Sequence, residues 1–422
     1  MAKEEKQEKE SGSRLDKLRD LALAIASHQM LIQMLGSKWA ALIVERLDAS
    51  EKRLMDTIEE ELERKTFTGA ASDTVRRLTG IRKKLAAIRR EAIASAREEI
   101  RREAAELAEN DAKWAKTVTK KLGSEKEAGK LRDLPERSVN ALVDRSIING
   151  RSFDQWFQSL SREDAERLEI LIQRAVSEGW SIQEVRTAIL GTRANGYTDG
   201  LLETTRKTAT NMARTLCSGV ANQAKQAFYD ANRDVVIGDE WLSTLDGRTC
   251  PACGALDRKR WKPDENHPVP PLHHQCRCVL LPVTPASDYA EESRPAANAD
   301  FMAEARRMYE KKFPRDKYPN KDWDKLAAST RQEYYYRAIR EYEKLHGQGS
   351  AFTQVPGGMT YRDYLEQAPD QLKRDILGKY RYEQYKAGKL KITDFIPPYP
   401  DRRLTVRELK KRDLASFRRP RA

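Results

Sequence analysis

The sequence is poor in the residues that most often bind metals or form cross-links. Its 422 residues include only 5 cysteines and 5 histidines, and aromatic residues make up 7%. So few cysteines exclude a disulfide-dense secreted scaffold, in which cysteine is abundant. Any site that uses cysteine and histidine must therefore come from a small part of the chain.

A long apolar segment is also missing. The longest apolar run, from Leu21 to Leu35, is interrupted by His28, Gln29 and Gln33. Crossing a bilayer takes roughly 20 predominantly apolar residues. We therefore expect no membrane partner.

Charge, by contrast, is plentiful. The chain has 78 Lys and Arg against 65 Asp and Glu, which gives a net charge of +13 and a pI near 9.3. Such a balance favours a polyanionic partner or an acidic protein surface, with solubility alone as the alternative explanation. The length predicts two or three domains.

The scarce metal-binding residues gather between Trp241 and Thr284. Cys250 and Cys253 form a C-x-x-C pair, and the segment HHQCRC then adds further candidate ligands. A structural zinc ion takes four tetrahedral nitrogen and sulfur ligands, usually from two such turns. The candidate ligands of a structural Zn2+ are therefore Cys250, Cys253, His273 and Cys276, with Cys278 as a substitute for Cys276.

The sequence does not choose between Cys276 and Cys278. If the CRC segment is a strand, both side chains point to the same face, and His274 points away from His273. The alternatives to a metal site are reduced, partly buried thiols or a disulfide formed after cell lysis. A native disulfide is disfavoured, because we expect no signal peptide and cytosolic disulfides are uncommon.

The flanks of this cluster have the composition of strands. Residues 234–245 are β-branched and aromatic, Asp246 and Gly247 predict a turn, and Val279 to Leu281 form a short apolar strand. The prolines between the two ligand pairs exclude a helix there. A small metal-stapled antiparallel β-unit is predicted.

The rest of the chain has helical periodicity. Residues 1–13 are charged and are expected to be disordered or weakly helical, and residues 14–134 should form a long helical arm. One apolar stripe runs from Leu78 to Ala92 after Ser72, a candidate N-cap, and it has no evident partner within the chain. We therefore expect this stripe to pack against another helix, in a second copy or in a partner protein. The basic residues on this helix more often form a solvated face than a DNA contact: Arg82, Lys83, Lys84, Arg89 and Arg90.

Three further segments complete the predicted organisation. Residues 135–284 should form a compact helical domain that ends in the cysteine cluster, with Ser181 as an N-cap and with Gly179 and Gly191 at helix ends. Residues 285–300 have the composition of a linker, and 301–422 that of a helical C-terminal extension. Its last part, 401–422, carries nine Lys and Arg against three Asp and Glu, so it could follow DNA phosphates or an acidic protein surface, a mobile tail being the alternative.

Several motifs together resemble a known family. The segments WLSTLDGRTCPACGALD and PPLHHQCRC, with the upstream helix TATNMARTLCSGVANQAKQAFYD, resemble the phage head morphogenesis family, the Mu F-like minor head proteins. The resemblance covers about residues 140–284. The family commonly has Gly where Arg258 stands and a Pro-Asn pair at His274 and Gln275. A Leu-Gly turn and a Gly-Lys-Leu segment in the C-terminal block are also similar to the tails of such proteins.

The resemblance implies a fold and a role. The fold expected is mainly α with a small α+β core: long N-terminal helices, a helical Mu F-like domain with a metal-stapled antiparallel β-unit, and a helical C-terminal extension. The role expected is that of a structural minor head protein of a tailed bacteriophage. Such a protein would bind the portal ring and packaged double-stranded DNA, and in addition a major capsid or scaffold protein. It would lie inside the procapsid and virion, assembled in the cytoplasm of the bacterial host.

Two other classes of function, a nuclease and a fused effector, are alternatives to a structural head protein. A metal-braced nuclease of the His-Asn-His type would need a further histidine and asparagine after the cluster, where only VLLPVT and the linker follow. An effector or toxin fused behind a Mu F-like domain would need a catalytic constellation in the C-terminal block, whose sole histidine is His346. No catalytic residue and no enzymatic activity are therefore predicted.

Overall fold

Long helices packed side by side make up most of the molecule, as predicted. The structure is a computed structural model that describes residues 2–63, 71–195, 197–286, 293–319, 321–326 and 328–392. The basic segment 401–422 lies outside the described residues. In chain order the helices before the sheet are α1 (Ala2–Ala49), α2 (Glu51–Glu63), α3 (Ala71–Leu122), α4 (Glu125–Ala128), α5 (Glu136–Arg145), α6 (Phe153–Glu178), α7 (Ile182–Leu190) and α8 (Leu201–Ala231).

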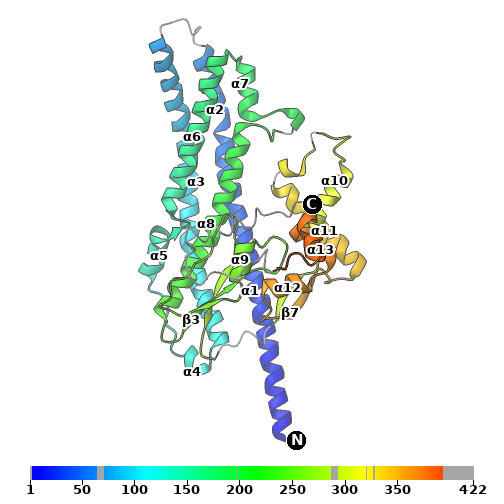
Figure 1. Ribbon diagram of the computed structural model, residues 1–422. Coiled ribbons are helices and arrows are strands. Elements are labelled where there is room, and N and C mark those ends of the chain that lie inside the picture. The colour runs from blue at the N-terminus through cyan, green and yellow to red at the C-terminus, as the bar shows by residue number, and fades with distance from the viewer. Residues whose placement is uncertain are drawn as a thin grey trace.

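The main core lies where α1, α3, α6 and α8 run along one another (Figure 1). Apolar residues at helical spacing, such as Trp39 and Ile43 of α1, face Ile93 and Ile100 of α3 and are buried. The small residues of α8 allow close packing, since a Cβ on Gly219 would lie 2.6 Å from two carbons of Ile148. This close approach explains why α8 is rich in small residues.

The apolar stripe that begins near Leu78 packs against other helices of the same chain. Ile81 and Leu85 are buried with Leu54 and Ile58 of α2 and Leu168 of α6 in a second core cluster. The prediction that this stripe lacks an internal partner is therefore wrong. Sequence periodicity identified the buried face but could not show that α2 folds back along α3 to cover it.

The helix signals were predicted well inside the domain and less well at the N-terminus. Ser181 caps α7 in a capping box, and Gly179 ends α6 in the left-handed conformation at φ 69°. In contrast, α1 begins at Ala2, so the backbone of residues 2–13 is helical rather than disordered. Figure 1 shows these first turns of α1 (dark blue) continuing beyond the rest of the molecule.

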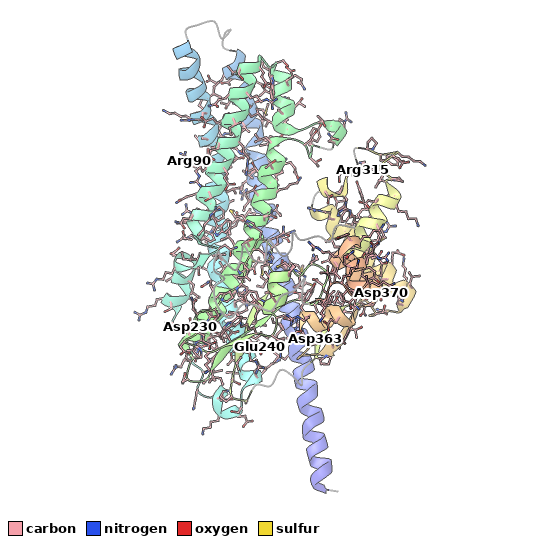
Figure 2. The ribbon with its side chains drawn as sticks, viewed as in Figure 1. Arg90, Asp230, Glu240, Arg315, Asp363 and Asp370 are labelled. Atoms are coloured by element: carbon pink, nitrogen blue, oxygen red, sulfur yellow. The ribbon has the colours of Figure 1, made fainter. Side chains whose placement is uncertain are left out.

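Buried ion pairs connect the long helices. Arg89 of α3, counted in the predicted basic face, instead donates to Asp164 of α6 at 2.6 Å, and both side chains are buried. Near the other end of the bundle, Asp111 of α3 binds Lys225 of α8 and, at 2.9 Å, Nε2 of His28 of α1. The basic face is therefore smaller than predicted. Figure 2 shows Arg90, an exposed member of it, on the α3 side of the bundle.

A three-stranded sheet in the order β4-β3-β5 covers one end of α8. Its strands are β3 (Gly238–Leu242), β4 (Arg260–Trp261) and β5 (Val279–Val283), and β3 pairs antiparallel with both neighbours. The short helix α9 (Pro251–Leu256) connects β3 to β4. The predicted antiparallel β-unit is thus confirmed. A small hairpin of β1 (Ile147–Ile148) and β2 (Arg151–Ser152) precedes α6.

The C-terminal extension packs against the sheet region rather than following a free linker. Residues 293–297 of the predicted linker form β6 (Ser293–Ala297), which pairs antiparallel with β7 (Phe352–Pro356), whereas residues 287–292 lie outside the described part. The linker composition was misleading because a strand at the edge of a sheet can contain proline. The helices here are α10 (Phe301–Lys312), α11 (Ala328–His346), α12 (Tyr361–Gln367), α13 (Asp370–Leu377) and α14 (Lys379–Lys386), and short 3-10 turns occur at Arg193–Asn195 and Trp323–Lys325.

The sequence predicted no segment that is long and apolar enough to cross a bilayer. Among the described residues, none of the helices combines the length and the apolar character needed to cross a bilayer.

Candidate metal centre

The first half of the cysteine cluster is formed by the start of α9. Cys250 is the N-cap of this helix and Pro251 occupies its first turn, a position that suits proline because no backbone donor is needed there. The Cys250 sulfur accepts a hydrogen bond from the backbone N–H of Cys253 at 3.4 Å. The helix start therefore places both sulfurs on the same side of the turn.

The second half comes from the segment that leads into β5. The backbone N–H of Cys276 donates to the His273 carbonyl at 3.2 Å, which closes a turn, and Gln275 within it has φ 60°. Thr215 of α8 supports the turn by accepting from the backbone N–H of Gln275 at 3.3 Å. The turn brings His273 and Cys276 to the two cysteines of α9.

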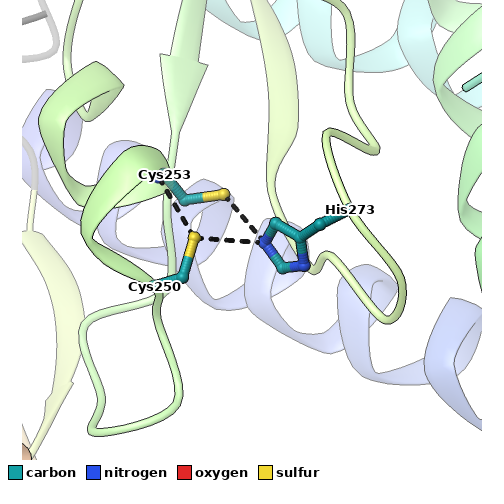
Figure 3. Close-up of side chains that lie close together, drawn as sticks. All are labelled: Cys250, Cys253 and His273. Atoms are coloured by element: carbon teal, nitrogen blue, oxygen red, sulfur yellow. Dashed lines mark hydrogen bonds between the residues drawn. The ribbon is translucent and has the colours of Figure 1, made fainter. Parts of the chain in front are cut away.

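The side chains of the two halves meet closely (Figure 3). Nε2 of His273 lies 3.2 Å from the Cys250 sulfur and 3.3 Å from the Cys253 sulfur. The sulfurs of Cys253 and Cys276 are 3.7 Å apart. All five cysteines of the chain are free thiols, so no disulfide occupies the cluster.

Cys278 lies at the edge of this group. Cys253, Cys276 and Cys278 form one group of mutually close donors, and Cys250, Cys253 and His273 form another, so Cys253 belongs to both. Ser243 also contacts the Cys278 sulfur at 3.5 Å. Cys276, in contrast, interacts with His273 as well as with Cys253. Cys276 is therefore better placed than Cys278 to complete a set with Cys250, Cys253 and His273.

Three distances within the cluster can be compared with those of a tetrahedral zinc site. Zinc bonds of about 2.3 Å to sulfur and about 2.05 Å to nitrogen place two ligand sulfurs about 3.8 Å apart, and a sulfur and a nitrogen about 3.6 Å apart. The Cys253–Cys276 separation of 3.7 Å agrees with this, and the two contacts of His273 are a few tenths shorter. The described residues could thus hold a metal ion, whose identity the distances alone do not fix.

The electrostatics favour the thiolate form, which metals bind, at Cys250 and Cys276, whereas hydrogen bonding to Cys250 raises the pKa of Cys253. Hydrogen bonding from Cys253, with help from His273, lowers the pKa of Cys250 to about 4. Hydrogen bonding to Cys250 and Cys276 raises the pKa of His273 to about 10. Burial raises the pKa of Cys278 above its ordinary value, which agrees with a peripheral position.

The surroundings hold the ligands in position. Nδ1 of His273 lies 2.8 Å from the carbonyl oxygen of His274, so Nδ1–H can donate there and leave Nε2 for a metal. Cys253, Cys276 and Cys278 are at most 3% exposed. A buried thiol set with its histidine fixed by a second contact is typical of a structural site rather than a catalytic one.

The C-terminal extension closes over α9. The ring of Tyr361 lies so close to Gly254 that a Cβ there would be 2.5 Å from Cδ1 of the ring. Asp257, at the end of α9, accepts from the backbone N–H of Tyr361 at 2.8 Å and from Arg294 of β6 at 2.9 Å. The cluster is therefore joined on this side to residues far away in the chain.

Some residues that shape the site had no signal in the sequence. Ser243 donates to the Cys253 carbonyl and accepts from the indole N–H of Trp241, in addition to its contact with Cys278. Asp257 and Arg294 belong to this group too. Serines and charged residues are frequent throughout the chain, so only the fold distinguishes these three.

A comparison with known proteins agrees with the sequence resemblance. Residues 137–281 match the family model described as Phage Mu protein F like protein. No curated protein and no solved structure gave a significant match. The matched span, about a third of the chain, includes α8, β3, β4, the first part of β5 and every residue of the cysteine cluster. This span is a Mu F-like region, and the family suggests a protein of phage head morphogenesis.

The two departures from the family pattern occur where the backbone is left-handed. Arg258 has φ 65°, at a position where the family commonly has Gly, and Gln275 has φ 60°, where it commonly has Asn. Gly and Asn are the residues that adopt this conformation most readily. Arg258 and Gln275 thus adopt a conformation that Gly and Asn reach more readily.

Proposed function

From the Mu F-like region, we propose that this protein is a structural minor head protein of a tailed bacteriophage, which binds the portal ring during procapsid assembly and contacts packaged DNA. The observation that carries the proposal is the match of residues 137–281 to the family model. The net charge of +13 supports a polyanionic partner. In this proposal the protein lies inside the procapsid and the virion, assembled in the host cytoplasm, where a major capsid or scaffold protein is a further partner.

The cysteine cluster has a structural role in this proposal. Zinc bound by Cys250, Cys253, His273 and Cys276 would fix α9 to the turn before β5, and Cys278 would lie beside the set. The buried sulfurs of Cys253 and Cys276 and their separation of 3.7 Å support zinc. Because α9 also contacts the C-terminal extension, the ion would stabilise the junction between the two parts of the chain.

A patch on α1 is our candidate surface for the portal. The apolar stripe near Leu78 is buried against other helices of the chain, so it is not available to bind the portal. Met30, Leu31 and Met34 are instead 54%, 57% and 55% exposed, and they adjoin one another on one side of the helix. An apolar patch of this kind on a long helix is typical of a protein contact.

We expect the protein to co-elute with its own portal when the two are expressed together and separated by size at moderate salt. The double change Met30→Glu and Met34→Glu should weaken that association about tenfold or more, because two charges would then have to be desolvated at the contact. Leu345→Glu is the matched control, since Leu345 is 82% exposed on a different helix. Point changes are preferable to deleting residues 14–110, which would remove a large part of the main core.

Two outcomes would count against the head-assembly proposal. One is separate elution of the two proteins. The other is the formation of normal, infectious particles by a phage that lacks this gene. Both together would move an effector role to first place.

The basic segment 401–422 gives a second prediction. We expect the chain to bind double-stranded DNA without sequence preference, and we expect truncation after Pro400 to reduce both the affinity and its salt dependence. For every phosphate that the truncated chain no longer neutralises, the slope of log K against log salt should fall by about 0.9, because fewer counterions are released. Fluorescence anisotropy with a mixed-sequence duplex at several salt concentrations would measure this. An unchanged slope would assign the charge of this segment to a protein contact instead.

A further inference from the structure

Arginine side chains without a carboxylate partner flank the turn that carries the metal ligand His273. Arg151 of β2 lines a hollow together with His273 and His274. Arg214 of α8 contacts Gln275 of the turn, and Arg331 of α11 lies close enough to Arg214 to lower its pKa. No ion pair to these three is found within the part of the chain that the structure describes. Most other arginines of the bundle have such partners, for example Arg89 and Arg206.

The side near Arg151 contains a hollow of about 470 Å3 lined by Asn149, Arg151, Trp156, Leu272, His273 and His274. The guanidinium of Arg151 lies over the Trp156 ring at 4.9 Å, and the ring of His274 meets the same indole edge-on at 5.8 Å. Nδ1 of His274 is 3.3 Å from the Thr215 hydroxyl. The hollow thus presents a fixed guanidinium and an exposed imidazole beside the metal centre.

The other side is more strongly cationic. Arg214 donates to the side chain of Gln275 at 3.4 Å, and its Nε is buried without a hydrogen-bond partner. Burial and the positive charges of Arg248 and Arg331 lower the pKa of Arg214. Cations crowded in this way are stabilised by an anion placed among them.

The carboxylates of Asp246 and Asp300, near these arginines, already bind other groups. Asp246 binds Arg277 through both oxygens at 2.7 Å, and its distance to Arg248 is longer, 3.8 Å. Arg248 instead lies over the ring of Tyr335 at 5.2 Å. Asp300 accepts from two backbone N–H groups at the start of α10. These groups leave an excess of positive charge at the junction between the Mu F-like region and the C-terminal extension.

We propose that Arg151, Arg214, Arg248 and Arg331, with His274 between them, form a phosphate-binding strip that holds the backbone of double-stranded DNA across the turn of the metal centre. This proposal rests on the DNA contact of the proposed function and adds a second, structured site to the terminal segment 401–422. Cations distributed on both sides of a turn suit a chain of phosphates better than one small anion. Arginine is also the residue that binds phosphate most specifically.

The strip would depend on the metal centre. Gln275, which orients Arg214, and His274, which borders the hollow, both lie between the ligands His273 and Cys276. A loss of the ion would therefore release the turn that connects the two sides. DNA binding by the strip, unlike binding by the terminal segment, is expected to fall when the metal is removed.

The test compares two triple variants of the full chain. Arg214→Gln, Arg248→Gln and Arg331→Gln remove three charges of the strip, whereas Arg162→Gln, Arg174→Gln and Lys207→Gln remove three exposed charges that each pair with a glutamate on the same helix. We expect the strip variant to bind a mixed-sequence duplex about tenfold more weakly at moderate salt. Its salt slope should be lower by about 2.7, which corresponds to three phosphates that are no longer neutralised.

Two further measurements make the result specific. Metal content and circular dichroism should be unchanged in both variants, which shows that folding is intact. In the unaltered protein, bound duplex should protect Arg214, Arg248 and Arg331 from modification by phenylglyoxal, as mapped by mass spectrometry. Inorganic phosphate alone should protect them weakly, which separates free phosphate from the DNA backbone as the source of the ligand.

The outcomes separate this strip from the wider proposal. If the strip variant and the control bind DNA equally well, with no protection of the three arginines, the strip is not a DNA site. If the strip variant loses the portal instead of DNA, the charges belong to a protein interface and the inference is wrong. If the unaltered chain does not bind duplex DNA at all, the DNA contact of the proposed function fails together with the strip.

Discussion

Changing Cys250 and Cys253 together to serine is expected to abolish metal binding and to unfold the sheet region. The unaltered protein, purified in reducing buffer, should contain about one zinc per chain, because two groups of three close donors share Cys253 and together supply enough ligands for a closed site. In small zinc domains the metal contributes on the order of 10 kcal/mol to folding. The apolar cluster around Trp241 is built mostly from the same segment, so it would be lost together with the metal.

Metal analysis and limited proteolysis would measure this effect. Residues 234–284 should become protease-sensitive in the double variant, while the helices of the main core survive because their contacts form a separate cluster. Cys217→Ser is the matched control, since Cys217 is a buried free thiol outside the metal cluster. Cys276→Ser should lose the metal and Cys278→Ser should keep it. Folded protein with almost no zinc, or full zinc in the double variant, would refute the assignment.

Replacing Asp111 by asparagine is expected to destabilise the helical bundle by about 3–5 kcal/mol, because it leaves a buried ammonium without its counter-charge. Asp111 and Lys225 are both 0% exposed, and His28 is stacked on Trp114 with 4.1 Å between ring centroids. Thermal or urea unfolding would measure the loss. The double variant Asp111→Leu with Lys225→Met removes both charges and should be much closer to the unaltered protein. If the single and the double change destabilise the protein equally, the loss of stability comes from altered packing and not from the unpaired charge of Lys225.

The same pair predicts a dependence on pH. Burial alone would raise the pKa of Asp111, but Lys225 and His28 outweigh it and hold this pKa below the ordinary value. The stabilisation is therefore complete above the pKa of the unfolded carboxyl, about 3.9, and is lost as the pH falls through the lower folded pKa. The single variant should lack this part of the acid unfolding.

Much of the candidate site could be predicted from the sequence because its signals are local. The C-x-x-C pair and the HHQCRC segment identified every residue of the cluster that the structure brings together. Serine and glycine caps in the Mu F-like region were also predicted correctly, since capping depends on a few neighbouring residues. The preference for Cys276 over Cys278 needed the fold, because it depends on where His273 lies.

Long-range pairings could not be predicted in this way. The charged composition of residues 2–13 indicated disorder or weak helicity, and their backbone continues α1. The composition of residues 285–300 indicated a linker, although β6 pairs with a strand that follows it by two helices. Arg89 was assigned to a solvated face, because a sequence does not show that Asp164 lies opposite it. The errors at the linker and at Arg89 each concern a partner far away in the chain.

The pairing of β6 with β7 has a consequence for how the chain tolerates cleavage and change. Ala297 and Phe352 are paired residues in this small sheet, so the two ends of the segment between them lie next to each other. This segment, which contains α10 and α11, forms a module with its own apolar cluster around Phe301 and Tyr309. A protease cut inside it would leave both fragments joined through the sheet. A short turn from Ala297 to Phe352 would bypass it and spare the metal centre, which makes this module the natural place for relatives to differ in length.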